Sequence, residues 1–353
     1  MARVTPAERK SDALKAPPQK AKSRTLKKRS RALGTARDRL KPMPTRAPSW
    51  TKSKPIALKP DATVDDAIAV VVTSCLAHWK RNLGAAVDGR APEGLHQVRV
   101  SLRRLRSALT AFKAFIPPEQ RETLNTEAKW LLSALGPVRD LDVFVRELAA
   151  PLAGRLSDSA DLVQLMRAAR AAQKSAQVSA ARALESVRAK RFAARIEAWR
   201  DGRGWRGGET KRDARKTEAA DFAKRLVNRR VDNILTEFHD VEALKAEERH
   251  ELRIAVKKTR YAIEFLHDVL PAKRAQRLAG ILKSLQDSLG HLNDIEVAER
   301  TVSALVNEAD SGLVRRQIAT GGSAVGVYHK DAAADAEPLT FKLWRKLKKA
   351  PSL

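Results

Sequence analysis

One cysteine, few aromatic residues and no long apolar run mark this 353-residue chain, and each shortage excludes a class of protein. With Cys75 alone, the chain forms neither an internal disulfide nor a cysteine-based metal cluster. No apolar stretch reaches the roughly 20 residues that a membrane-spanning helix requires. The charged N-terminus has no apolar segment behind it, so it does not resemble a secretory signal. We therefore expect a soluble cytoplasmic protein without a membrane partner.

The charge is strongly one-sided, with a formal net value of +28. Residues 1–60 hold 18 of the Lys and Arg residues against 3 acids, together with 8 of the 16 prolines. This composition cannot bury enough apolar surface to fold, and it predicts a disordered basic tail. Residues 61–353 are also cationic. A polyanionic partner is expected: nucleic acid, an anionic surface or another phosphate polymer.

One pattern occurs twice, at a constant offset of 154 residues. Residues 96–146 and 250–300 align without a gap and are identical at 13 of 51 positions, which indicates a duplicated module. An apolar core requires only that apolar spacing be kept, yet these copies also keep charged residues. The kept polar pairs are His96/His250, Arg99/Arg253, Arg106/Arg260, Lys129/Lys283, Asp140/Asp294 and Arg146/Arg300.

The first segment of each copy predicts a helix with cations on one side. At about 100° per residue, four cations of each copy fall within an arc of about 80°. We call these eight residues the cationic strip: His96, Arg99, Arg103, Arg106, His250, Arg253, Lys257 and Arg260. Apolar residues such as Leu102 and Val256 fall on the opposite side. Arg104 lies outside the arc.

Like charges three and four residues apart repel by about 0.2–0.5 kcal/mol per pair, so some favourable interaction must offset the cost of the cationic strip. One reason is a repeating polyanion held by Arg forks. The other is internal pairing with Asp140, Asp142, Asp294 and Glu296, which are too few to neutralise eight cations. The recurring Lys129, Lys283, Arg146 and Arg300 either extend the strip or are ordinary solvated residues. His96 and His250 are interpreted as neutral or titrating donors that contact phosphate, and the alternative is that they are hydrogen-bonded structural residues.

After Asp61 the periodicity is helical throughout, which predicts an all-α fold of two antiparallel bundles related by an approximate twofold. We expect repeat 1 at about 61–200 and repeat 2 at about 209–353, joined by a glycine-rich linker at 202–208. Gly321-Gly322 interrupts the last long helix. The expected helices are 63–88, 95–115, 119–136, 140–155, 159–199, 213–240, 245–270, 272–290, 292–309, 311–330 and 338–349.

The two His-x-x-Arg helices, each followed by a Leu-Gly-x-x-x-Asp segment, closely resemble the CHAD family, the conserved histidine α-helical domain. The resemblance covers about residues 61–350 as a stand-alone domain. It implies two bundles around a basic channel, binding of inorganic polyphosphate and association with polyphosphate granules. Carried over by position, the contacts are His96, Arg99, Arg103, Arg104, Arg106, His250, Arg253, Lys257, Lys258, Arg260 and Tyr261. Arg139 is matched by Asn293 and Pro137 by His291, so the repeats depart from symmetry there.

Enzyme chemistry has little support in the sequence. His239-Asp240 and His267-Asp268 invite comparison with metal-dependent phosphohydrolases, but His267-Asp268 corresponds to Lys113-Ala114 in the first copy. The chain has no Glu-x-Glu-x-Lys strand of the triphosphatase domain that many relatives carry, and no P-loop or nucleophile motif. We expect a binding protein with no catalytic residue, cofactor or metal. The alternatives are a nucleoid-associated protein whose tail binds DNA and a polyphosphate-tethered scaffold.

Overall fold

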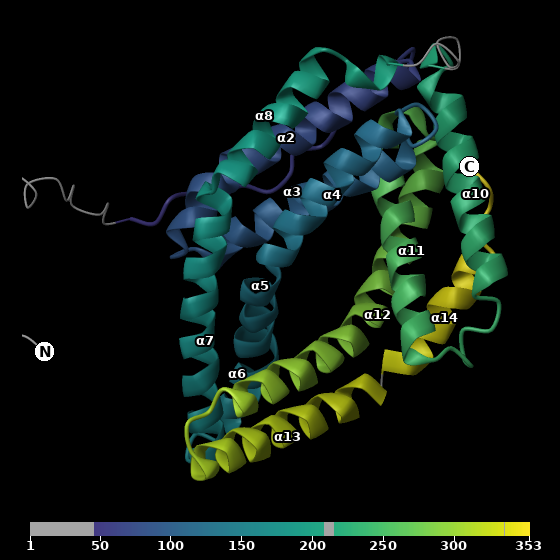
Figure 1. Ribbon diagram of the computed structural model, residues 1–353. Helices are drawn as coiled ribbons and strands as arrows, with labels where there is room; N and C mark the ends of the chain where they lie inside the picture. The colour runs from purple at the N-terminus through teal and green to yellow at the C-terminus, as the bar shows by residue number, and fades with distance from the viewer. Residues whose placement is uncertain (1–45, 208–214, 335) are drawn as a thin grey trace, which may run out of the picture. The chain divides into compact units, whose positions relative to one another are not determined.

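The computed structural model describes residues 46–207, 215–334 and 336–353, and the all-α prediction is confirmed (Figure 1). The first half contains α2 (Val64–Asp88), α3 (Pro92–Ala111), α4 (Pro118–Ala134), α5 (Gly136–Val143), the π-helix η2 (Phe144–Ala149), α6 (Ala150–Arg155), α7 (Ala160–Glu185) and α8 (Val187–Asp201). The second half contains the short 3-10 helices η3 (Gly204–Arg206) and η5 (His267–Val269), with α10 (Ala219–Glu237), α11 (Ala246–Phe265), α12 (Ala272–Asn307), α13 (Gly312–Ala334) and α14 (Ala336–Lys348).

The helices of the two copies keep the offset seen in the sequence. Both bounds of α11 lie 154 residues after the bounds of α3, and α12 begins 154 residues after α4. Proline precedes or opens the later helix in both copies, at Pro117-Pro118 and Pro271. A fixed φ and a missing N–H suit proline to the first turn of a helix, so the same break recurs.

Three expected helix boundaries were wrong. The helix expected at 159–199 is two helices, because Ser186 has an extended backbone (φ −60°, ψ 153°) and its hydroxyl accepts from the Ala189 amide at 3.2 Å. The helices expected at 272–290 and 292–309 form the single α12, which continues through Gly290. The segment expected to begin at Asp140 starts at Gly136 and includes the π-helical turn. The first residues of the expected 213–240 helix lie outside the described residues.

The Gly321-Gly322 pair serves close packing and does not interrupt α13. A Cβ at Gly321 would lie 2.8 Å from the carbonyl oxygen of Asp161 and 3.2 Å from Leu165 Cβ, both on α7. A Cβ at Gly322 would overlap the side chain of Val302 on α12. Two adjacent residues without side chains therefore allow α13 to approach both neighbouring helices.

The buried apolar residues form two cores, and each core combines helices from both repeats. The larger core joins α2, α3, α4 and α8 with α10, α11, the first half of α12 and α14. The smaller core joins η2, α6 and α7 with the second half of α12 and α13. The two cores therefore do not coincide with the two repeats, because α12 contributes to both along its 36 residues.

The folded part of the chain begins earlier than residue 61. The Thr51 amide donates to Asn82 Oδ1 at 2.9 Å, and the Leu58 amide donates to Asp268 Oδ2 at 3.1 Å. Ile56 and Leu58 are buried in the larger core. The compact unit starts at Ala47, so residues 47–60 do not belong to the expected tail, and residues 1–45 lie outside the described residues.

A buried carboxylate fixes the segment that follows α8, which was expected to be part of the linker. Asp65, in the first turn of α2, accepts hydrogen bonds from Trp205 Nε1 at 2.7 Å and Arg206 Nη2 at 2.6 Å, and pairs with Arg203. Burial raises the pKa of Asp65, but the bonds from Arg206 and Trp205 outweigh it and bring the pKa to about 2. Residues 203–206 are therefore anchored to α2.

Candidate functional site

The helix α3 buries its apolar side and presents cations on the other, as the spacing predicted. Val98, Leu102 and Leu105 are almost fully buried in the larger core. The cations on the opposite side are half-buried; they are His96, Arg99, Arg103 and Arg106. Partial burial holds these side chains in place without covering them with protein.

The helix α11 repeats this arrangement and packs against α3. Leu252 and Val256 are fully buried, whereas Arg253, Lys257 and Arg260 are half-buried and His250 is exposed. Burial lowers the pKa of Lys257 to about 8, and the largest contribution from a charge comes from Arg103 on the facing helix. The two halves of the cationic strip therefore lie within electrostatic reach of each other.

Of the neutral and titrating forms that the sequence left open, the surroundings of His96 favour the neutral one. Burial lowers its pKa to about 4, and the neighbouring Arg139, Arg103 and Arg99 lower it further than Glu93 raises it. His96 is therefore neutral at physiological pH. Its buried Nδ1 has no hydrogen-bond partner among the described residues, so a ring atom is free to contact a ligand.

A backbone carbonyl holds Arg99 in place, while part of its guanidinium makes no hydrogen bond to a described residue. Its Nη1 donates to the carbonyl oxygen of Leu132 at 2.8 Å, and its buried Nε has no hydrogen-bond partner among the described residues. Burial lowers its pKa to about 10, with Arg103 acting in the same direction and Asp140 opposing. A Cβ at Gly136 would lie 3.8 Å from Nη1, and the matching Gly290 has the same relation to Arg253 at 4.0 Å from Nε.

Asp140 is the acid that pairs internally with the cationic strip. Burial raises its pKa, although Arg99, Arg300 and Arg139 each favour its ionised form. It lies between cations of both repeats, because Arg300 belongs to α12. Internal pairing with Asp140 therefore accounts for part of the strip; the side chain of Asp294, which matches Asp140 in the second copy, lies outside the described residues.

At the other end of the strip, two arginines are positioned by amides from the following helix. Arg106 Nε donates to Asn125 Oδ1 at 2.8 Å, and Arg260 Nε donates to Gln286 Oε1 at 3.2 Å. Arg260 Nη1 also lies 3.9 Å from Glu264 Oε2. An amide orients a guanidinium without neutralising it, so the charge of Arg106 is not compensated by its amide, whereas Arg260 is partly compensated by Glu264.

Unpartnered buried donors lie along the half of the strip that belongs to α3. The Nε atoms of Arg99 and Arg103 and the Nδ1 of His96 are buried without a hydrogen bond to any described residue. A buried polar atom without a partner costs about 1–3 kcal/mol, so it indicates a water or ligand that completes the site. The two arginine Nε atoms are donors in cationic surroundings, so the ligand that suits them is an anion, whereas His96 Nδ1 donates in only one tautomer of the neutral ring.

Three residues carried over by position lie off the strip. Arg104 is fully buried, forms an ion pair with Glu264 (3.2 Å) and lies 5.7 Å from the ring centre of Phe265. Tyr261 is 5 % exposed and stacks on the same Phe265 ring. Lys258 is exposed in the groove between α10 and α11, where its carbonyl oxygen accepts from Arg230 Nη1 at 2.6 Å. Arg104 and Lys258 each stand about 80° from their histidine along the helix, which turns them away.

The four recurring cations outside the strip fall into two groups: two lie on exposed helix faces, and two lie beside a buried acid. Lys129 is exposed on α4, and Lys283 is exposed and pairs with Asp287 at 2.9 Å, so both belong to solvated faces. Arg300 lies beside Asp140 and joins the site, whereas Arg146 lies beside Asp142 in a groove lined by α7.

Arg139 belongs to the site and was missed by the repeat comparison. It influences the pKa of both His96 and Arg99, and its Nη2 donates to Glu147 Oε1 at 3.2 Å. The comparison noted only that Asn293 stands at the matching position, so charge kept in both copies did not mark it. Its place three residues after Gly136, which faces Arg99, was the available signal.

The two His-Asp pairs make contacts that hold the local structure together. His267 Nδ1 lies 3.3 Å from Asp268 Oδ1, while the other oxygen of Asp268 binds the Leu58 amide; Asp240 Oδ1 accepts from the Ala243 amide. Among the described residues, no three His, Cys, Asp or Glu side chains gather closely enough to hold a metal ion. None of the helices in the described ranges is both long and apolar enough to cross a membrane.

Comparison with known proteins identifies the family. The family model of the CHAD domain matches residues 70–303. The crystal structure of the CHAD domain from the plant Ricinus communis superposes with a TM-score of 0.73 at 27% identity, covering 86% of this chain and 98% of that one. PptA from Streptomyces chartreusis shares the fold, with a TM-score of 0.59 at 16% identity over 80% of this chain and 100% of its own. No curated protein matches. With most of its length matched by the family model, the chain belongs to the CHAD domain family.

Proposed function

We propose that this protein binds inorganic polyphosphate along the cationic strip of α3 and α11 and acts as a binding protein at cytoplasmic polyphosphate granules, without catalysis. The observation that carries the proposal is the set of buried donors on Arg99, Arg103 and His96 that have no partner in the described protein. The resemblance to the CHAD family favours polyphosphate over other polyanions.

The chemistry of the strip suits a ligand with charge repeated along its length. Successive cations on each helix stand three or four residues apart, which spaces them by about 5 Å along the axis. Arginine binds two phosphate oxygens with one planar fork, and Lys257 adds a compact charge between two arginines. A single phosphate would engage only one or two of these groups, whereas a chain engages all of them.

Multivalent phosphate binding predicts a steep dependence on salt. Each neutralised phosphate releases condensed counterions, as on DNA, so affinity falls by orders of magnitude between about 50 and 200 mM salt when many phosphates are contacted. An affinity that does not change with salt contradicts this mode of binding.

The test measures binding of labelled long-chain polyphosphate by fluorescence anisotropy, in competition with duplex DNA at equal phosphate concentration. We expect DNA to displace little polyphosphate. The variant R99E/R103E/R253E/K257E should lose binding, whereas K129E/K190E/R191E/K283E, which reverses the same number of exposed charges elsewhere, should keep most of it. Equal losses in both variants, or equal competition by DNA, reject the strip as a selective site.

The tail supports a second candidate, a nucleic-acid-binding role. Residues 1–45 hold 14 Lys and Arg residues against 3 acids, so they attract any polyanion. A variant without residues 1–45 retains the packed segment that contains Ile56 and Leu58. We expect it to keep stoichiometric polyphosphate binding and to lose affinity for DNA. If polyphosphate binding disappears with the tail, the strip is not the principal site.

A further inference from the structure

The helix α7 carries an exposed face that polyphosphate binding does not use. Val163, Arg167, Arg170, Lys174 and Val178 follow one another at spacings of four, three, four and four residues, and all five are exposed. This spacing places them on one side of the helix. The two valines are about half exposed (49% and 46%), and the three cations lie between them.

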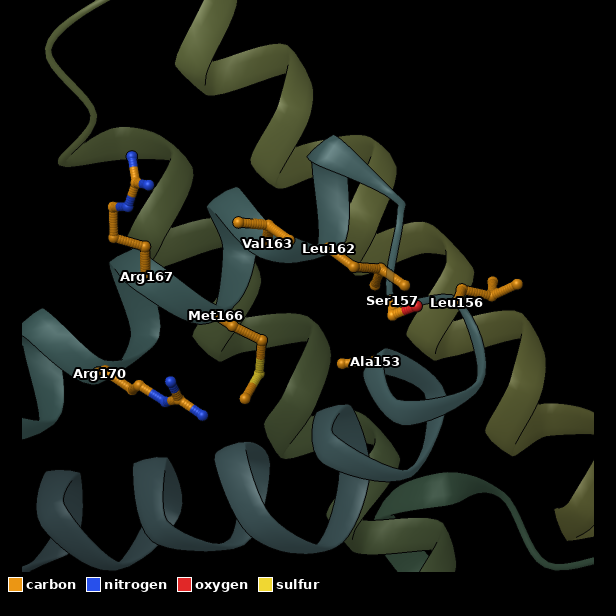
Figure 2. Close-up of a pocket in the computed structure, with 8 residues that line it drawn as sticks. All are labelled: Ala153, Leu156, Ser157, Leu162, Val163, Met166, Arg167 and Arg170. Atoms are coloured by element: carbon orange, nitrogen blue, oxygen red, sulfur yellow. The ribbon is translucent and has the colours of Figure 1, made fainter.

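Two adjoining hollows line this face of α7. The first, of about 420 Å³, lies between α7 and α6 and is drawn in Figure 2, where Met166 and Arg170 extend from α7 and Leu156 marks the far side. The second, of about 760 Å³, lies between α7 and the α5–η2 segment. They share Met166 and Arg170, so they form one groove, which we call the α7 groove.

The α7 groove combines apolar walls with a cationic rim. Its walls are largely aliphatic and include Leu156, Val145 and Met166, of which Leu156 is 51% exposed. Arg146, on η2, faces Arg170 and Lys174 of α7 from the opposite side. Exposed aliphatic side chains are ordinary when scattered, but gathered along a groove they mark a surface that a partner covers.

A buried carboxyl group lies in the floor of the α7 groove. Asp142 is 2% exposed, and its Oδ1 accepts from Gln173 Nε2 at 2.5 Å. Its Oδ2 is buried and has no hydrogen-bond partner among the described residues. When ionised, this carboxylate repels any anion placed above it, so an anionic ligand pairs with the cationic rim of the groove and not with its floor.

We propose that the α7 groove docks an acidic amphipathic helix of a partner protein. Leucine-like side chains of that helix would pack near Val163 and Val178, and its carboxylates would pair with Arg170, Lys174 and Arg146. The valines are 15 residues apart on α7, a rise of about 22 Å, which an opposing helix covers in about four turns. An apolar anchor at each end with charge pairs between them follows the helix-in-groove mode of recognition.

Charge excludes the occupants available from this chain itself. The N-terminal tail is cationic and the whole chain has a net charge of +28, so neither the tail nor a second copy complements a cationic rim. None of the residues of the cationic strip lines either hollow, although Asp142 in the floor lies within electrostatic reach of Arg139. A partner bound there would be carried to polyphosphate without competing for it.

The experiment uses the full-length chain and two fluorescent 18-residue peptides of identical composition. One peptide places leucine and glutamate on a single helical face, and the other disperses them around the helix. We expect the first to bind at least tenfold more tightly by anisotropy. R170E/K174E and, separately, V163N/V178N should each weaken that binding at least tenfold, whereas the matched α8 variant K190E/R191E should change it less than twofold.

Three outcomes overturn the proposal. Equal binding of both peptides means that only general charge attraction is present. Absence of binding by the amphipathic peptide means that the groove accepts no such helix. Loss of peptide binding in K190E/R191E equal to that in R170E/K174E removes the groove as its location. Circular dichroism spectra of each variant confirm that folding is intact, and polyphosphate titration of V163N/V178N should give the wild-type affinity.

Discussion

Raising the pH from 7 to 9 should weaken polyphosphate binding through one side chain, Lys257. Burial and the neighbouring Arg103 and Arg253 lower its pKa to about 8 in the free protein. A bound phosphate chain opposes all of these effects, so we expect the pKa in the complex to return to about 10.4 or above. Lys257 is then mostly neutral at pH 9 before binding and protonated after it. The affinity falls by about tenfold, or about 1.4 kcal/mol.

Raising the pH is expected to stabilise the folded protein without ligand, although it weakens polyphosphate binding. Because the unfolded chain holds the Lys257 proton more tightly than the folded chain, the free energy of unfolding without ligand rises between about pH 8 and 10.4. By the same reasoning, K257M should stabilise the free protein at pH 7, by at most about 3 kcal/mol, while it weakens polyphosphate binding.

Calorimetric titration of polyphosphate at pH 7, 8 and 9 and constant ionic strength tests this reasoning. The wild type should take up about half a proton per site at pH 8, measured from the dependence of the binding enthalpy on the buffer. K257R keeps the charge over the whole range, and its affinity should be nearly flat. The reasoning is refuted if K257R loses about tenfold between pH 7 and 9 as the wild type does, since another group would then be titrating.

Three predictions concern stability and are measured by urea denaturation. R104A should lower the free energy of unfolding by about 3 kcal/mol and R104M by less, because both variants remove the partner of Glu264 but methionine fills the buried volume that alanine leaves empty; neither should alter polyphosphate affinity by more than twofold. G322V should lower the free energy of unfolding by about 1–3 kcal/mol, because its side chain would clash with Val302, and adding V302A should restore part of that stability. A loss of stability that V302A does not change contradicts the packing role of Gly322. D65N should cost about 1–3 kcal/mol at pH 7 and reduce the loss of stability that the wild type shows from about pH 4 to 2; an unchanged acid transition contradicts the assignment to Asp65.

The cationic strip was predictable because helical periodicity fixes burial and exposure together. The spacing that buries Leu105 and Leu252 turns Arg103 and Lys257 to the other side, about 160° and 140° away around their helices. The direction of Arg104 followed from the same periodicity. Its assignment as a ligand contact came only from its position in the family pattern, which states a residue's identity and not its direction.

The features that the sequence did not predict depend on contacts between helices. Ser186 caps α8 through its bond from the Ala189 amide, but it stands among good helix formers, and a serine alone does not mark a helix end in the sequence. Gly321-Gly322 was interpreted as an interruption because glycine disfavours a helix locally, but contact with α7 and α12 decides its role. The shift in the pKa of His96 arises from burial and from Arg139 on another helix, which no pattern within α3 reveals.

The sharing of α12 between both cores determines when this chain becomes able to fold during synthesis. The larger core requires Leu343, Trp344 and Leu347 of α14, and the smaller core requires Ile318 and Val325 of α13. Neither core is complete until nearly the whole chain has left the ribosome. Until then, the apolar faces of the first repeat stay exposed to solvent. Chains stalled or cut after residue 200 should therefore aggregate or engage chaperones, and the two repeats should not be separable into independent proteins.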